Sequence, residues 1–103
     1  MLPKKYRLNL RDYPEFFKHA KRVQTTFFRL FITPATNDSL AAVIVPKTAS
    51  MTATKRTKLK RKLRAALCPI LQTHPRLKIV VVGYEKALDK KVSKLEALIE
   101  EKI

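Results

Sequence analysis

Residues 55–64 carry the strongest chemical signal in this sequence, because seven of the ten side chains are Lys or Arg and none is acidic. Ammonium and guanidinium groups bind phosphates by charge and hydrogen bonding, so this run is suited to holding a polyanion. A solvated helix face and a membrane-surface helix are the two alternatives. We expect a nucleic acid to contact the following residues: Lys55, Arg56, Lys58, Lys60, Arg61 and Arg64.

Residues able to perform catalysis on their own are scattered. The eight acids are mostly in the C-terminal segment, and no pair has the spacing of a two-metal site. His19 and His74 are each isolated, and Cys68 falls on the buried side of an expected helix. There is no glycine-rich phosphate loop and no metal-ligand motif. We therefore expect neither catalytic nor metal-binding side chains in this chain.

Aromatic residues form the second candidate site. Tyr13 and Phe17 lie four apart and would share one face of a short helix. In the following strand, Phe27, Arg29 and Phe31 alternate with the core residues and would face the other way. Aromatic rings beside a basic rim hold single-stranded nucleic acid by stacking. The five residues would then line one cleft; the alternative is a second small core under the helix.

The overall charge supports a polyanionic partner. The chain has 103 residues, enough for one small domain, and a net charge of +15. Residues 1–84 hold 18 Lys or Arg and only 3 acids, whereas residues 85–103 hold 5 of each.

A single cysteine fits a reducing compartment. The longest apolar run, residues 40–45, is too short for a membrane span, and no secretory core is found, so we expect a cytoplasmic protein.

The periodicity of the sequence predicts the elements that must position these residues. We expect a helix over 13–21 that begins with an Asp12/Glu15 capping box, and two strands, 25–32 and 40–45, paired as an antiparallel hairpin. The basic helix should bury Leu59, Leu63, Ala66, Leu67 and Ile70 and kink or end near Cys68, before Pro69. A buried strand (77–83) and a helix (88–103) follow, the latter with an apolar stripe at Val92, Leu95, Leu98 and Ile99. The predicted fold class is α+β: a small two-layer sandwich in the order α-β-β-β-α-β-α, with a mixed four-stranded sheet and a βαβ crossover.

The basic segment KRTKLKRKLR resembles the RNR signature of the bacterial ribonuclease P protein component, a pattern close to RNRIKRxLR. Arg56, Thr57 and Lys58 stand at the RNR positions, with Thr57 replacing the asparagine and Lys58 the second arginine. VPKTASMTATKR resembles the lead-in to that helix, and Lys47 matches a lysine there. The family's opening is similar to YRLNLRDYPEFFKHAKRV here, and its first long strand is similar to FFRLF. Its C-terminal strand resembles KIVVVGYEKALD.

The resemblance implies a protein subunit of ribonuclease P, which removes the 5′ leader from precursor tRNA. Its partners would be ribonuclease P RNA, bound by Lys47 and the basic helix, and precursor tRNA, whose leader would lie on Tyr13, Phe17, Phe27, Arg29 and Phe31. The RNA subunit would bind the catalytic Mg²⁺, and the crossover would be left-handed. We predict no protein partner and no membrane. The alternatives are a ribosomal or RNA-chaperone protein, a DNA-binding module and an autonomous nuclease.

Overall fold

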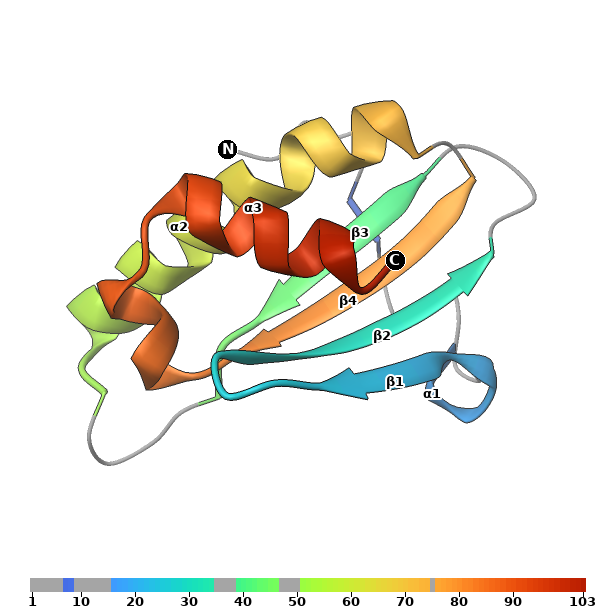
Figure 1. Cartoon of the computed structure of the whole chain (residues 1–103). Helices are drawn as coiled ribbons and strands as arrows, with labels where there is room; N and C mark the ends of the chain where they lie inside the picture. The colour runs from blue at the N-terminus through green and yellow to red at the C-terminus, as the bar shows by residue number, and fades with distance from the viewer. Residues whose placement is uncertain (1–6, 9–15, 35–38, 47–50, 75) are drawn as a thin grey trace.

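A computed structural model describes residues 7–8, 16–34, 39–46, 51–74 and 76–103. In these ranges the chain forms one four-stranded sheet, and its longer helices lie across one face of that sheet (Figure 1). The elements are α1 (Phe16–His19), β1 (Lys21–Gln24), β2 (Phe28–Pro34), β3 (Leu40–Ile44), α2 (Ala53–Thr73), β4 (Leu77–Gly83), the 3-10 helix η3 (Glu85–Asp89) and α3 (Val92–Glu101). The predicted order of helices and strands is confirmed, with η3 as an addition.

The sheet has the strand order β1-β2-β4-β3. Strand β2 is antiparallel to both β1 and β4, whereas β3 is parallel to β4, so the sheet is mixed as predicted. Helix α2 connects the parallel pair and completes the βαβ unit. The predicted hairpin between 25–32 and 40–45 is wrong, because β4 lies between those two strands. β4 supplies Ile79, Val80 and Val81, all fully buried, and such a strand belongs in the centre of a sheet.

The main core fills the space between the sheet and helices α2 and α3. Phe28 and Leu30 of β2 are fully buried there, and Ile32 packs against the same cluster. Helix α2 contributes its predicted stripe, with Leu71 in addition, and α3 buries Leu95 and Ile99. On the opposite face of the sheet, a smaller cluster joins Leu8, Phe16 and Val80 beneath α1. Among the described residues the two faces therefore differ: one is covered by α2 and α3, the other by the short helix α1 and Leu8.

Several element boundaries differ from the predictions. Helix α1 ends at His19, whereas the helix was expected to continue to residue 21, and β1 occupies residues 21–24. Strand β2 begins at Phe28 because the Thr25 hydroxyl accepts a hydrogen bond from the Phe28 amide at 3.1 Å and forms a turn. Helix α3 begins at Val92, since η3 takes up part of the segment expected to be helical. The Asp12/Glu15 capping box lies outside the described residues.

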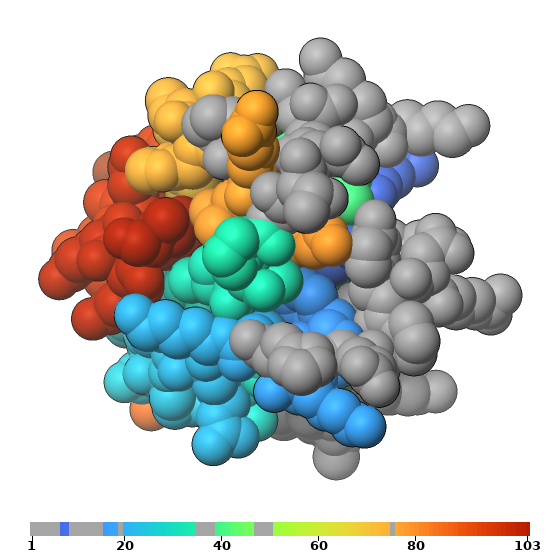
Figure 2. Space-filling model, turned by 90° about the vertical axis from the view of Figure 1, so that its right-hand side faces the viewer, coloured from blue at the N-terminus to red at the C-terminus, as the bar shows by residue number. Residues whose placement is uncertain are grey.

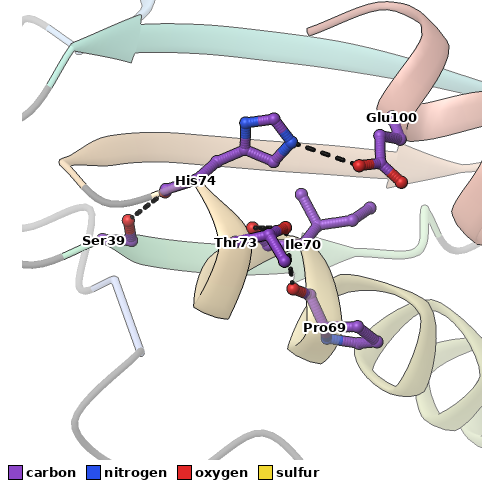
Figure 3. Close-up of polar contacts among 6 residues, drawn as sticks. All are labelled: Ser39, Pro69, Ile70, Thr73, His74 and Glu100. Carbon is purple, nitrogen blue, oxygen red and sulfur yellow. Dashed lines mark hydrogen bonds and ion pairs between the residues drawn. The ribbon is translucent and has the colours of Figure 1, made fainter.

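Helix α2 begins at the N-cap Thr52, whose hydroxyl accepts a hydrogen bond from the Lys55 amide at 3.3 Å. It continues through Pro69 to Thr73, so of the two outcomes predicted for Pro69, a kink or an end near Cys68, the end is wrong. Ile70 and Leu71, just beyond the proline, are buried against the core, and this burial favours continuation of the helix. The Thr73 hydroxyl donates to the carbonyls of Pro69 and Ile70 (Figure 3).

The side chains of Ser39 and Glu100 contact the C-terminal end of α2 (Figure 3). The Ser39 hydroxyl donates to the His74 carbonyl at 2.6 Å and accepts from the Leu77 amide at 3.1 Å, which joins α2, β3 and β4. His74 Nε2 lies 3.3 Å from Glu100 Oε1 on α3. This end of α2 therefore lies at the start of β3 and β4.

The N-terminal half of α2 lies at the opposite end of β4, against Gly83. A Cβ atom at Gly83 would come within 2.5 Å of Leu63 Cδ1 and 3.3 Å of Leu59 Cδ2. The single glycine of the chain is thus needed for the close approach of helix and strand, and not for an unusual backbone angle. This approach fixes the position of the basic helix relative to the sheet.

Candidate nucleic-acid interface

The buried stripe of α2 determines where its basic side chains point. Lys55, Lys58 and Arg61 are exposed, and Lys60 and Arg64 are half-buried on the flank of the helix. An open groove runs along the outer surface of the N-terminal half. It is lined by Ala53, Thr54, Thr57, Lys58, Arg61 and Lys62. Helix α2 thus presents a basic groove, with Lys58 and Arg61 one turn apart in it.

Arg56 is placed differently from the other basic residues of α2. The side chain is half-buried, and its Nε atom is buried without a hydrogen-bond partner among the described residues. A buried donor without a partner is costly, so a group that binds there would be favoured. Arg56, at the first position of the RNR-type motif, therefore has a buried donor that lacks a hydrogen-bond partner among the described residues.

Lys62 belongs to the same basic run but has a structural contact. Its ammonium group donates hydrogen bonds to the carbonyls of Leu88 at 2.5 Å and Lys90 at 3.1 Å. Charged hydrogen bonds of this kind are stronger than neutral ones. Lys62 therefore holds α2 against η3 and the residue that follows it, so part of its charge is used within the fold.

The opposite face of the sheet carries the aromatic residues of the second candidate site. The Phe17 ring contacts Phe31 edge-on, with centroids 4.8 Å apart and an interplanar angle of 83°. Phe16 contacts Phe17 at 5.4 Å and 88°. Phe16 is only 5% exposed and is core, whereas Phe17 is 46% exposed although it is a large apolar side chain. We call Phe17 and Phe31 the aromatic patch; it borders the small core but is not enclosed by it.

Polar side chains lie on the same sheet face as the aromatic patch, further along the strands. Arg29 is two residues from Phe31 in β2, and its Nε donates to Gln24 Oε1 at 2.6 Å. The Gln24 side chain also hydrogen-bonds the Tyr84 hydroxyl, with its Nε2 at 3.2 Å from that oxygen. Tyr84 was not among the predicted residues. Its position directly after a strand expected to be central was the only signal that could have found it.

Phe27 does not lie with the aromatic patch, so the prediction that it shares a face with Phe31 is wrong. The residue precedes β2, at the turn formed by Thr25, and its ring packs against the main core on the helix side. The Lys90 ammonium lies over the ring, 4.8 Å from its centroid, in a cation–π contact. Strand alternation does not apply to a residue in a turn. Tyr13 and Lys47, also predicted, lie outside the described residues.

The structure also bears on the residues that were weighed for catalysis. Cys68 is a free, half-buried thiol, and the ring of His74 contacts Glu100. Within the described ranges, no three His, Cys, Asp or Glu residues are grouped so that they could hold a metal ion. None of the helices in that part of the chain is long and apolar enough to cross a membrane.

Comparison with known proteins relates this arrangement to one family. Residues 2–102 match the family model of Ribonuclease P. The fold is similar to that of a *Staphylococcus aureus* RNase P protein mutant with defective mRNA degradation activity, at a TM-score of 0.78 and 20% identity, covering 95% of this chain and 85% of that one. It is also similar to the RNase P protein from *Thermotoga maritima*, at 0.74 and 24% identity, covering 92% of both chains. No curated protein sequence gives a significant match. The family match spans nearly the whole chain and fits the basic helix and the fold, so this chain belongs to the Ribonuclease P family.

Proposed function

We propose that this subunit binds ribonuclease P RNA through α2 and the single-stranded 5′ leader of precursor tRNA through the aromatic patch. The observation that carries the proposal is the exposure of Phe17. A ring that served only the small core would be enclosed as Phe16 is, yet Phe17 is 46% exposed and packs edge-on against Phe31. Arg29 lies on the same sheet face and adds a positive charge. A base stacked on an aromatic ring gains about 1–3 kcal/mol.

The RNA subunit is assigned to α2 because its basic run, residues 55–64, presents positive charge and contains no Asn or Gln. Lys58 and Arg61 in the outer groove are placed to contact phosphates, and Arg56 has a donor that a phosphate oxygen would satisfy. Each phosphate contact should change the slope of log affinity against log salt by about −0.7 to −0.9. The other predicted contacts on this helix are Lys55, Lys60 and Arg64.

Hydrolysis of the leader is assigned to the RNA partner, which would hold Mg²⁺ at the scissile phosphate. In this division of roles the chain positions the substrate: α2 fixes the subunit on the RNA, and the aromatic patch holds the leader strand on the opposite face of the sheet. Binding energy from the leader, remote from the reacting bond, can orient that bond for attack. The proposed place of action is the cytoplasm.

The deciding experiment is cleavage of precursor tRNA by a bacterial ribonuclease P RNA at low Mg²⁺, with and without this protein. We expect faster cleavage with the protein, and a product cut at the mature 5′ end. The matched control is the same protein with Arg61 and Arg64 changed to Glu, which should stimulate less because it binds the RNA subunit less tightly. Tight RNA binding without any stimulation would overturn the proposal and favour a ribosomal or RNA-chaperone role.

A further inference from the structure

A second group of basic residues lies at the end of the sheet away from the N-terminal half of α2. Its members come from α1, β1 and the start of β4. They are Lys18, Arg22 and Arg76, all exposed, and the half-buried Lys78. Figure 2 views the molecule from this end and shows the start of β4 and the end of β2 above β1 and α1 on one face. We call these four residues the far-end basic surface.

The strand register places this surface next to the aromatic patch. Arg22 of β1 pairs directly with Phe31, so the two side chains share a sheet face and lie side by side. Lys78 pairs with Thr33, which is two residues beyond Phe31 on that face, a step of roughly 7 Å along the strand. Arg29 lies two residues from Phe31 in the other direction. The aromatic patch thus lies between Arg29 on one side and the far-end basic surface on the other.

The charge of this end is weakly compensated within the described residues. In the described part of residues 7–84 there is no acid, and Glu100, which is at this end of α3, pairs with His74. Lys78 has a contact of its own, so the argument rests on the exposed members. A field of one sign beside a stacking platform is the arrangement that holds a nucleic-acid backbone.

Arg76 adds an independent observation. Its φ is 63°, in the left-handed region where glycine is favoured and where a side chain costs free energy. The residue is exposed, so no packing of the side chain offsets that cost. Arg76 adds an exposed positive charge immediately before β4, at this end of the sheet.

We propose that the far-end basic surface binds phosphates of the 5′-distal part of the leader, the nucleotides that extend past the aromatic patch. This inference rests on the proposed function, in which the RNA subunit lies at α2. The N-terminal half of α2 is at the Gly83 end of β4 and Arg76 precedes its other end, so the two basic surfaces lie at opposite ends of the strand. A leader cut at the RNA subunit and held on Phe17 and Phe31 leaves the protein at the far end, where phosphates meet Arg22 and Arg76.

The test uses the assembled holoenzyme and precursor tRNAs with leaders of graded length. The variant carries Lys18→Gln, Arg22→Gln and Arg76→Gly, the last of which also relieves the left-handed backbone and protects folding. We expect about tenfold weaker binding of long-leader precursors at low salt, and a salt slope smaller by about 2 in magnitude. Short-leader precursors and the RNA subunit should bind as tightly as with the wild-type protein.

A matched control removes three charges elsewhere, by changing the exposed Lys86, Lys91 and Lys94 to Gln. It should keep the affinity for long leaders. The inference is overturned if the far-end variant weakens short- and long-leader binding equally, or if it weakens binding of the RNA subunit. If the affinity of the wild-type holoenzyme for precursor tRNA does not depend on leader length, the proposed function fails and this inference fails with it. If the wild-type affinity depends on leader length and the far-end variant shows the same dependence, only this inference fails.

Discussion

Replacing Phe17 by alanine removes a ring that is half exposed, and its neighbour Phe16 offers a matched control. The two residues are adjacent in α1 and their rings touch at 5.4 Å, but Phe16 is 5% exposed and Phe17 is 46% exposed. If Phe17 serves the leader and Phe16 serves the core, the two alanine variants should fail in opposite ways. The Phe17 variant should lose affinity for leader-bearing RNA, and the Phe16 variant should lose stability.

The magnitudes follow from burial. A phenylalanine buries roughly 150–250 Å² when enclosed, and at 46% exposure Phe17 buries about half of that. At about 25 cal/mol per Å² the lost burial is worth about 2–3 kcal/mol as an upper bound. The enclosed ring of Phe16 should cost about 3–5 kcal/mol. Loss of one stacked base costs about 1–3 kcal/mol, so leader affinity should fall by roughly 5- to 150-fold in the Phe17 variant.

Two assays measure these effects. Urea unfolding gives the change in the free energy of unfolding for each variant. Titration of the holoenzyme with precursor tRNA and with mature tRNA gives the leader-specific part of the affinity. The reasoning is refuted if Phe17→Ala weakens both RNAs equally, or if it destabilises the fold as much as Phe16→Ala does. Either result would place Phe17 in the core and leave the leader without its stacking platform.

Three further predictions concern α2 and its contacts. Changing Lys62 to Met should reduce the free energy of unfolding by about 1–2 kcal/mol, because two backbone carbonyls lose a charged donor. Its affinity for the RNA subunit, measured by filter binding, should fall no more than that of a Lys86→Gln control, and a larger loss would make Lys62 a phosphate contact. Changing Gly83 to Ala should cost about 1–3 kcal/mol in urea unfolding, since Cβ would meet the fully buried Leu63; unchanged stability would mean that the helix can move aside. Reversing Arg61 to Glu should weaken RNA-subunit binding and lower the magnitude of the salt slope by about 1, and equal affinity at moderate salt would remove this residue from the interface.

The candidate site was predictable from sequence where the argument depended on helical or strand periodicity. The stripe of Leu59, Leu63 and Ile70 follows from a spacing of three and four, and it forced the exposed basic residues outward. Phe31 and Arg29 were placed correctly by alternation within a regular strand. Phe27 was misplaced because a turn at Thr25 breaks the alternation just before β2. Local periodicity is reliable only inside an element, and sequence gives the ends of elements less well.

The sequence by itself determined the chemistry of this protein: its charge, an acid-free basic helix, the helix and strand types, and the family to which it belongs. Tertiary structure decided which segments became neighbours. β4 lies between β2 and β3, because a strand with buried residues on both faces buries most apolar surface at the centre of a sheet. Its position depends on strands that are far away in the chain. Burial of Ile70 and Leu71 against the core favours continuation of helix α2 beyond Pro69. The Lys62 anchor, the exposure of Phe17 and the meeting of Arg22 with Phe31 are likewise contacts between distant segments, whose free energy exists only once the chain has folded.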